Sequence, residues 1–262
     1  MYEFEFEGYS KEQCEKYLER IGAEYDGNPT LENLDNLIHR HQIEVPFENL
    51  NLKMNLGPIN LDPDALFEKI VTNRRGGFCF ELNGSFLLLL KGLGYDAVGV
   101  MARVGIPFIG KLFDLSHRGI VVRIDGKKRY CDVGFGGPKA DWAIEITDEK
   151  QTKNGHTCWI EDTYEGWKMV KNESSDADGS VIIFAPIAML PTDFIANCDR
   201  LVNSGVSMFH QVRLVNRNLE NGYIDLKDNH FKMCVDGVVE ERDFDESEFA
   251  GIVEKYFGLK LN

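Results

Sequence analysis

The residues that could carry chemistry begin with a cysteine set between basic and apolar sequence. Cys79 follows Arg74, Arg75 and a double glycine in the stretch RRGGFCFELNGSFLLLL, residues 74–90. A thiol that only fills a core does not need such flanks. The apolar run predicts that a helix begins at Cys79, and a helix N-terminus carries unpaired N–H groups and about half a positive charge. Both features favour a thiolate, so Cys79 is a candidate nucleophile.

A nucleophilic cysteine also needs an imidazole as its proton partner and a third group to orient that imidazole. Among the six histidines, His117 has the clearest acidic partner, because Asp125-Gly126 is a strong signal for a two-residue hairpin turn. The register that follows from this turn carries His117 and Asp132 onto one face of the hairpin, on a diagonal. We therefore predict His117 as the base and Asp132 as its orienting group.

The same residues are also compatible with structural roles. A buried cysteine often only fills a core. A histidine and an aspartate on one hairpin face can form a surface pair. A zinc site could combine cysteine, histidine and aspartate ligands, but the usual clustered ligand spacing is absent, so we expect no metal.

Composition and charge restrict the classes of partner. The 262-residue chain is 43% hydrophobic and 27% charged, as is typical of a globular protein of one large domain or two to three small ones. Its net charge of −14 argues against a nucleic-acid partner, because binding a phosphate backbone requires a basic surface. A small anionic ligand needs only a local group of donors.

The N-terminus and the cysteines predict a cytoplasmic protein. The opening MYEFEFEGYSKEQ lacks a basic segment followed by an apolar core, so it is not a signal peptide. The longest purely apolar run, residues 86–90, is far too short to cross a bilayer, and we expect no membrane partner. Six widely spread cysteines without a CxxC pair favour reduced thiols.

The elements that must position these residues fall into three blocks. Apolar residues at helical spacing predict helices over about residues 10–22, 30–42, 62–71 and 79–91. From residue 95 the period changes to two and predicts strands. The last third mixes a short helix, an antiparallel meander and a closing helix, with meander turns expected at Asn221-Gly222, Asp228-Asn229 and Asp236-Gly237. Helices and strands in separate blocks predict an α+β fold rather than a doubly wound parallel sheet.

Four segments together resemble the arylamine N-acetyltransferase family. RRGGFCFELN is similar to the family's motif around its active-site cysteine, SHRGIVV to the segment with its histidine, and CDVGFGGP to the segment with its aspartate. VPFENLN, residues 45–51, resembles a fourth signature in the helical block. All four occur in the family's order. The resemblance covers nearly the whole chain, though it is weaker after about residue 140.

The resemblance implies three domains and a papain-like cysteine arrangement. The helical first domain, residues 1–93, would carry the catalytic cysteine. A β-barrel-like second domain, residues 94–190, would carry the histidine and the aspartate. The third domain, residues 191–262, would be an α/β lid.

Carried over by position, the resemblance also implies roles for individual residues. Cys79 would be the acyl-accepting nucleophile, His117 its proton partner and Asp132 the group that orients His117. The remaining implied roles are a salt bridge between Arg75 and Glu48 that holds the cysteine loop, support of the aspartate by Asn83, an acceptor contact at Phe47, and coenzyme A pyrophosphate contacts near Phe135, Gly136 and Gly137.

The chain departs from the family pattern in two places. SGVSMF, residues 204–209, stands where the family usually has a Ser–His–Pro stretch before a serine and a phenylalanine. Residues 139–142 lack the usual proline-leucine continuation. These changes concern the acceptor pocket and the coenzyme contacts and leave the triad candidates in place.

The implied activity is acetyl transfer from acetyl-CoA to the nitrogen of an arylamine or arylhydrazine, by a ping-pong mechanism through an acetyl-cysteine, as in xenobiotic metabolism. Acetyl-CoA would be a co-substrate, and no metal is needed. One alternative is another papain-like cysteine acyltransferase, amide synthase or hydrolase, which would differ in its acyl donor. The other is a catalytically idle binding protein, and the presence of all three triad residues argues against it.

Overall fold

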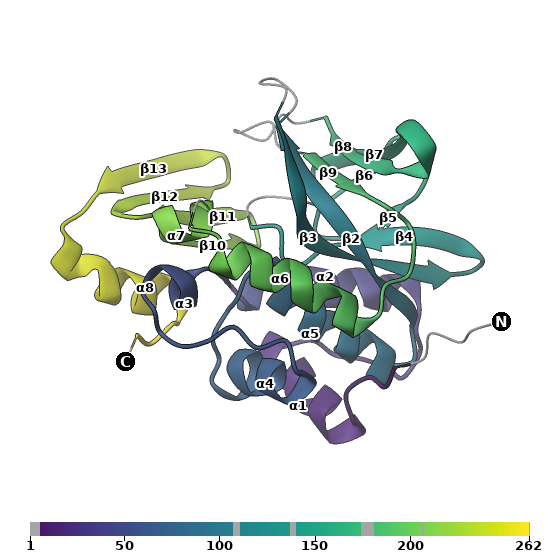
Figure 1. Cartoon of the computed structure of the whole chain (residues 1–262), viewed down its shortest axis with the longest axis horizontal. Coiled ribbons are helices and arrows are strands. Elements are labelled where there is room, and N and C mark those ends of the chain that lie inside the picture. Colours follow the sequence, from purple (N-terminus) through teal and green to yellow (C-terminus); the bar gives the residue numbers. More distant parts are fainter. Residues whose placement is uncertain (1–5, 107–110, 137–139, 174–180, 206, 262) are drawn as a thin grey trace.

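The computed structural model describes residues 6–106, 111–136, 140–173, 181–205 and 207–261. In Figure 1 the helices of the first block lie below two separate β-sheets. These helices are α1 (Lys11–Ile21), α2 (Leu31–Glu44), α3 (Leu50–Lys53), α4 (Pro63–Phe67) and α5 (Cys79–Gly92). The predicted helices over residues 10–22, 30–42 and 79–91 are confirmed. The predicted helix over residues 62–71 is confirmed in place, but after Phe67 it continues as one π-helical turn, Glu68–Thr72.

Local capping explains where the first helices begin. Ser10 Oγ accepts a hydrogen bond from the Gln13 backbone N–H at 3.3 Å, and Gln13 Oε1 accepts one from the Ser10 N–H at 3.0 Å. Thr30 Oγ1 accepts from the Asn33 N–H at 3.2 Å at the start of α2. Each bond satisfies a backbone donor that the helix leaves unpaired, so these helices begin where the sequence places the capping residues.

Helix α5 forms the centre of the molecule. Its side chains from Phe78 to Leu90 are buried, so it has no polar face, as expected of a helix surrounded by other elements. It packs against α1, α4 and strands β2 and β3 of the larger, eight-stranded sheet. Its residues make up much of the main hydrophobic core. Within the described parts of the chain, no helix has both the length and the apolar character needed to span a membrane.

The larger sheet is barrel-like, as expected. Its eight strands run in the order β5-β4-β3-β2-β9-β8-β7-β6, and each strand pairs antiparallel with its neighbours. The Ile160 N–H in β7 donates to the Thr147 carbonyl just after β5 at 2.9 Å, so the two ends of the sheet approach each other. The strands are β2 (Asp96–Ile106), β3 (Lys111–Ile124), β4 (Lys127–Cys131), β5 (Ile144–Glu145), β6 (Gln151–Lys153), β7 (His156–Asp162), β8 (Lys168–Asn172) and β9 (Val181–Phe184).

The hairpin between β3 and β4 has the predicted register. Ile124 pairs with Lys127 across the turn, and the ladder runs to Ile120 opposite Cys131. Strand β4 ends there, so Asp132 lies just beyond the ladder. On its other side, β3 pairs His117 with Ala102 of β2, directly before a register shift in that pair of strands. The turn therefore fixes the part of the hairpin that leads to both candidate catalytic residues.

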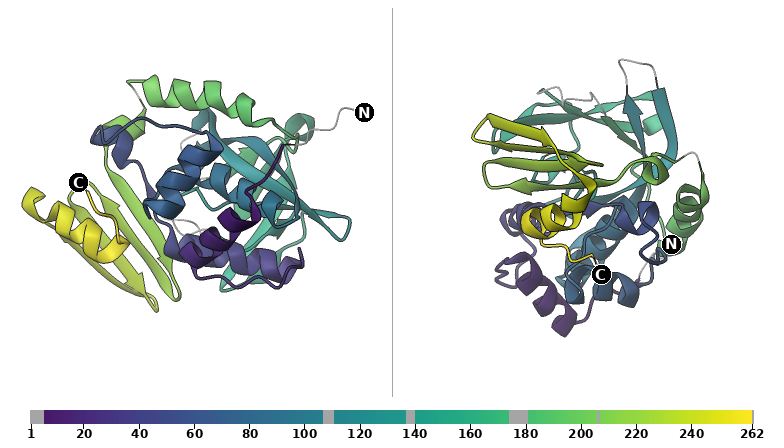
Figure 2. Two further views of the ribbon diagram at one scale, coloured as in Figure 1. Left: turned by 90° about the horizontal axis from the view of Figure 1, so that it is seen from below. Right: turned by 90° about the vertical axis from the view of Figure 1, so that its left-hand side faces the viewer.

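The smaller sheet combines strands from two blocks. Its order is β1-β10-β11-β12-β13, in which β1 (Phe47–Glu48) comes from the helical block and pairs with β10 (Leu214–Leu219). The other strands are β11 (Gly222–Lys227), β12 (His230–Val235) and β13 (Val238–Asp243). Figure 2 shows α8 (Phe249–Phe257) packed on this sheet, with which it shares a separate hydrophobic core. The segment of Phe47 and Glu48 thus ties the first block to the third.

One predicted turn of this sheet is wrong by one residue. Leu219 pairs with Gly222, so the turn consists of Glu220 and Asn221 rather than Asn221 and Gly222. Gly222 is needed within the strand, because a Cβ there would lie 1.8 Å from the carbonyl oxygen of Cys234. The expected turns at Asp228-Asn229 and Asp236-Gly237 are confirmed.

Two helices link the sheets. Helix α6 (Pro191–Asn203) packs on α5 and β3 and buries Phe194 and Cys198 in the main core (Figure 1). The short α7 (Met208–Gln211) follows and contacts α3. The third block therefore covers the first two blocks with α6 and forms its own core with the sheet and α8.

Candidate active site

Cys79 is the first residue of α5 and is 3% exposed. Its Sγ lies 3.5 Å from the Ser116 carbonyl oxygen, to which the thiol can donate. The helix start is fixed by Glu81, whose Oε2 accepts from the Phe78 N–H at 3.2 Å. A Cβ at Gly77 would lie 2.8 Å from the same oxygen, so the second glycine of RRGG allows this close approach. As the first residue of α5, Cys79 lies at the helix end that carries partial positive charge.

A buried ion network holds the segments before the cysteine. The Arg75 Nη2 atom lies 2.7 Å from Glu48 Oε1, and the Leu50 N–H donates to Glu48 Oε2 at 2.8 Å. Lys69 Nζ lies 2.7 Å from Glu81 Oε1. Burial opposes ionisation of Glu48, which is 0% exposed, but Lys69, Arg75 and the hydrogen bonds lower its pKa. Arg75 and Glu48 thus meet as expected, whereas Lys69 and Glu81 were not among the predicted site residues.

His117 and Asp132 form a short, buried pair. His117 Nε2 lies 2.5 Å from Asp132 Oδ2, and the two residues are 2% and 9% exposed. Burial favours the neutral forms, but the mutual attraction and the hydrogen bond raise the pKa of His117 and lower that of Asp132. Charge on Cys79 and a hydrogen bond to it also raise the pKa of His117. Since Nε2 is engaged by Asp132, Nδ1 is the nitrogen available to the sulfur.

The carboxylate of Asp132 is held on both oxygens. Its Oδ1 accepts from Asn83 Nδ2 at 2.8 Å and from the Gly134 N–H at 2.9 Å. Its Oδ2 accepts from the Tyr130 hydroxyl at 2.8 Å in addition to His117. Asn83 Oδ1 in turn accepts from the Val133 N–H at 2.9 Å, which fixes the backbone after Asp132. The predicted position of Asn83, one helical turn after Cys79, explains how α5 reaches this carboxylate.

Tyr130 is a site residue that the sequence analysis missed. It is buried, and its ring stacks on Phe184 with centroids 4.5 Å apart. A Cβ at Gly119 would lie 2.5 Å from its hydroxyl oxygen, so this glycine gives the ring its place. Its spacing could have predicted this role. Residues two apart on a strand share one face of the sheet, and Tyr130 is two residues before Asp132.

Three predicted binding residues gather beside the triad candidates. The Phe135 ring packs edge-on against the His117 ring, with centroids 5.6 Å apart. A Cβ at Gly136 would lie 2.9 Å from the ring of Phe47, so the two are in direct contact. Phe209, in the segment that departs from the family pattern, lies 6.1 Å from Phe47 between centroids. Gly137 lies outside the described residues.

A small cavity of about 20 Å³ opens between these groups and strand β10. It is bordered by Phe47, Asp132, Phe135, Gly136 and Arg217, among others. Burial lowers the pKa of Arg217, and its buried Nε has no hydrogen-bond partner in the described parts of the chain. Arg217 therefore brings a positive charge next to the glycine-rich segment, and no motif in the sequence marked it.

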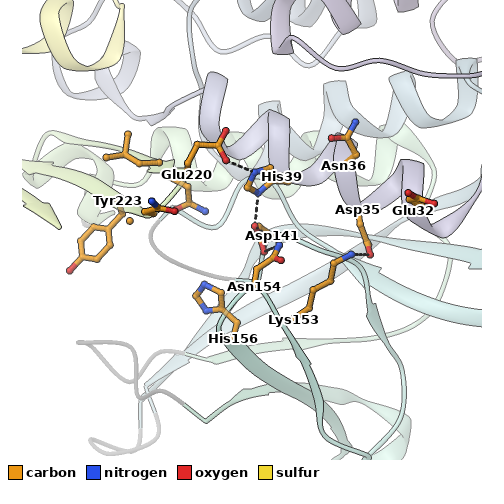
Figure 3. Close-up of a pocket in the computed structure, with 14 residues that line it drawn as sticks. Glu32, Asp35, Asn36, His39, Asp141, Lys153, Asn154, His156, Glu220 and Tyr223 are labelled. Atoms are coloured by element: carbon orange, nitrogen blue, oxygen red, sulfur yellow. Dashed lines mark hydrogen bonds and ion pairs between the residues drawn. The ribbon is translucent and has the colours of Figure 1, made fainter. Parts of the chain in front are cut away.

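A much larger cleft, of about 840 Å³, lies elsewhere and contains no triad candidate (Figure 3). His39 lies in it between two carboxylates, 2.5 Å from Asp141 and 3.1 Å from Glu220. Asp35 pairs with Lys153 at 2.6 Å. With Glu32, four carboxylates line this cleft. Its acidic lining makes it unsuitable for a phosphate-bearing ligand, so size alone does not identify the reaction centre.

Gln42 of α2 bridges the segment after β4 and strand β10. Its Nε2 donates to the Asp132 carbonyl at 2.9 Å, and its Oε1 accepts from Asn218 Nδ2 at 2.6 Å. Helix α2 thereby connects the backbone of Asp132 to strand β10. Among the described residues, no group of three or more His, Cys, Asp and Glu side chains is arranged to hold a metal ion.

Comparison with known proteins gives a consistent set of relatives. The family model of N-acetyltransferases matches residues 30–262. An arylamine N-acetyltransferase / N-hydroxyarylamine O-acetyltransferase of Salmonella typhimurium is 36% identical over 141 residues, 53% of this chain and 50% of that protein, so the chain spans half the length of that relative. The arylamine N-acetyltransferase of Escherichia coli is 27% identical over 251 residues, 94% of this chain and 88% of that protein.

The fold has close counterparts among solved structures. That of the arylamine N-acetyltransferase from Salmonella typhimurium has a TM-score of 0.89 with this chain at 25% identity, and the match covers 97% of this chain and 93% of that one. The whole architecture, including the smaller sheet and α8, is therefore shared.

Proposed function

The chain belongs to the arylamine N-acetyltransferase family, and from this premise we propose that it transfers an acetyl group from acetyl-CoA to the nitrogen of an aromatic amine or hydrazine. It is an acyltransferase that works by a ping-pong mechanism. The observation that carries this proposal is the contact of His117 with Asp132 beside the sulfur at the start of α5. A thiol, an imidazole and a carboxylate in this order are the parts that nucleophilic acyl transfer needs.

In the first half-reaction, Cys79 attacks the acyl donor. The raised pKa of His117 favours a protonated imidazole, and the sulfur reacts as the thiolate that pairs with this cation. The thiolate attacks the thioester carbonyl carbon of acetyl-CoA, a new carbon–sulfur bond forms, and the bond to the CoA sulfur breaks. His117 gives its proton to the departing CoA. Backbone N–H groups near Cys79 are the donors for the oxyanion, and one such donor typically contributes about 3 kcal/mol to transition-state stabilisation.

In the second half-reaction, the acceptor nitrogen attacks the acetyl-cysteine. His117 takes the proton from this nitrogen, the amide bond forms, and the Cys79 thiolate leaves. Asp132 holds His117 in the orientation and tautomer that both steps require. A weakly basic arylamine is mostly unprotonated at neutral pH and can attack, whereas an alkyl amine is mostly a cation.

We assign the binding of substrates to the aromatic and glycine residues beside the triad. Phe47 would contact the acceptor, and Phe135 and Gly136 would contact coenzyme A, with Gly137 as the remaining expected contact. Two observations support the assignment of substrate binding to this side of the molecule. Arg217 brings positive charge to the small cavity next to Gly136, and the large cleft is too acidic for the phosphates of coenzyme A.

The cellular setting that we propose is turnover of xenobiotic amines in the cytoplasm, without nucleic-acid or membrane partners. All six cysteines are free thiols, which suits a reducing compartment. The net charge of −14 disfavours binding to nucleic acid.

Release of CoA from acetyl-CoA tests the proposal. In the presence of an arylamine, steady release of CoA should match formation of the N-acetyl product, and without an acceptor only a single burst should appear. Steady release without any amine would indicate a hydrolase on the same triad. No release with acetyl-CoA, but turnover with another acyl donor, would favour an amide synthase.

A further inference from the structure

Asn49 of the VPFENLN segment is buried, and the proposed mechanism does not use it. The residue is 1% exposed and lies just before α3, yet its side-chain hydrogen bonds reach the third block. Nδ2 donates to the Phe209 carbonyl at 3.0 Å and to the Val212 carbonyl at 2.7 Å, and Oδ1 accepts from the Leu214 N–H at 2.7 Å. Both N–H donors of the amide are engaged, so the orientation of the side chain is fixed.

These bonds hold α7, a helix too short to be stable by itself. A helix of four residues cannot satisfy its own carbonyls, so they need partners from elsewhere. Asn49 supplies one donor to Phe209 within the helix and one to Val212 directly after it. Lys53 of α3 adds a third, from Nζ to the His210 carbonyl at 3.2 Å. The place of α7 therefore depends on side chains of the first block.

Helix α7 brings an aromatic ring to two others near the start of α5. The Phe209 ring lies 6.1 Å from the ring of Phe47 and 5.8 Å from the ring of Phe78, measured between centroids. Phe78 is fully buried and directly precedes Cys79. Phe47 and Phe78 belong to the first block, whereas Phe209 comes from the third. The aromatic cluster is therefore completed by a residue whose backbone Asn49 holds.

The other two rings of this cluster are held by different contacts. The backbone of Phe47 pairs with the glycine pair before α5 on one side and with β10 on the other. The Phe78 N–H donates to Glu81 Oε2 at 3.2 Å. None of these contacts involves the Asn49 side chain. Its loss should therefore displace Phe209 more than the other two rings.

We propose that Asn49 is a positioning residue for the acceptor: by holding α7 it keeps the Phe209 ring against Phe47, where both rings contact the aromatic ring of the amine or hydrazine. The inference rests on the proposed function and on the expected acceptor contact at Phe47. Aromatic rings in offset or tilted contact attract each other beyond the effect of their buried area, so this surface favours aryl acceptors over acceptors without a ring. Asn49 acts only through the ring that it positions.

Ping-pong kinetics separate this role from a general loss of structure. In such a reaction, kcat/KM for each substrate reports only the half-reaction in which that substrate takes part. Acetylation of Cys79 precedes attack by the acceptor, so kcat/KM for acetyl-CoA does not depend on the acceptor contact. Unsubstituted hydrazine is a second internal control, because it attacks the acetyl-cysteine without a ring. A damaged triad would slow all substrates, whereas a displaced Phe209 should slow only acceptors with an aromatic ring.

The test compares kcat/KM for acetyl-CoA, hydrazine and phenylhydrazine in the wild type, Asn49→Ala and Phe209→Leu. We expect both variants to lower kcat/KM for phenylhydrazine about fivefold, the size typical for loss of one aromatic contact, and to leave the other two values unchanged. Phe209→Tyr keeps the ring and should behave like the wild type. Asn229→Ala is the matched control and should change none of the three values, because Asn229 also joins separate segments, through the Phe244 carbonyl and Arg213.

Equal losses for all three substrates in Asn49→Ala would show a purely structural role, and an unchanged value for phenylhydrazine would show no role. Either result would overturn the proposal. If Asn49→Ala does not fold, Phe209→Leu carries the test, because Asn49 is proposed to act through that ring. A selective loss for phenylhydrazine would then support the proposal, and an unchanged value or equal losses would overturn it. Failure of the proposed function would instead appear as a wild-type protein that acetyl-CoA does not acetylate.

Discussion

His117 Nε2 lies 2.5 Å from Asp132 Oδ2, and both side chains are buried. The contact joins β3 to the residue that follows β4, and Asn83 of α5 donates to the same carboxylate. The orientation of the imidazole is therefore set jointly by the barrel-like sheet and by the helix that begins at Cys79. The orientation of His117, its protonation and the support of the site by neighbouring residues can therefore be tested separately.

Asp132→Asn should lower kcat by about 10⁴-fold, as in other triads, while the protein stays folded. The amide can still accept the hydrogen bonds from Asn83 and Gly134 with one oxygen, but it cannot hold a protonated His117. Steady-state acetylation of an arylamine, together with circular dichroism, measures both effects. Near-normal turnover would remove the orienting role of Asp132.

Tyr130→Phe should lower kcat by about tenfold. The change removes the hydroxyl that donates to Asp132 Oδ2, and a lost hydrogen bond to a charged group typically costs about 2 kcal/mol, part of which should appear in the barrier. Stacking on Phe184 should persist. Tyr95→Phe is the matched control, because the Tyr95 hydroxyl donates to the Thr30 carbonyl, away from the site, and should leave kcat unchanged. Equal effects of the two substitutions would argue against a specific role for Tyr130.

The raised pKa of His117 should make stability depend on pH. A group that binds its proton more tightly in the folded state stabilises that state fully below its unfolded pKa, near 6.5 for histidine, and loses this contribution as the pH rises through the folded value. The free energy of unfolding of the wild type should therefore fall more steeply between about pH 6.5 and pH 10 than that of His117→Gln. Urea denaturation at several pH values measures it. Parallel pH dependences would show that His117 is not protonated preferentially in the folded protein.

Glu48→Gln should destabilise the protein by about 3 kcal/mol, because removal of one partner of a buried ion pair leaves the other charge uncompensated. Glu48 binds Arg75 and the Leu50 N–H in the segment that precedes the cysteine, so activity should also fall. Lys11→Gln breaks an exposed pair with Glu15 and serves as the control, with no measurable change expected. If both variants unfold at the wild-type urea concentration, the network does not stabilise the site.

The parts of this site that the sequence predicted depend on local patterns. The start of α5 at Cys79 follows from the glycine pair and the apolar run, and the register of the β3–β4 hairpin follows from Asp125-Gly126. The three helices with strong apolar periodicity and the separation into helical and β blocks were predictable for the same reason.

The parts that were missed depend on contacts between distant segments. Lys69 meets Glu81, and Gln42 reaches Asp132, only because the helices pack as they do. The pairing of β1 with β10 brings together residues about 170 positions apart, and a two-residue strand carries almost no periodicity. The turn at Glu220 and Asn221 was displaced because Gly222 serves a close backbone approach rather than the turn.

Intact-protein mass spectrometry tests most directly whether Cys79 carries the acetyl group. Mixed with acetyl-CoA, the wild type should gain one acetyl group, about 42 Da, and an arylamine should then remove it. Cys79→Ala should show neither the gain in mass nor any formation of the N-acetyl product. Retained turnover in Cys79→Ala, or an acetyl group located by peptide mapping at a residue other than Cys79, would contradict the account.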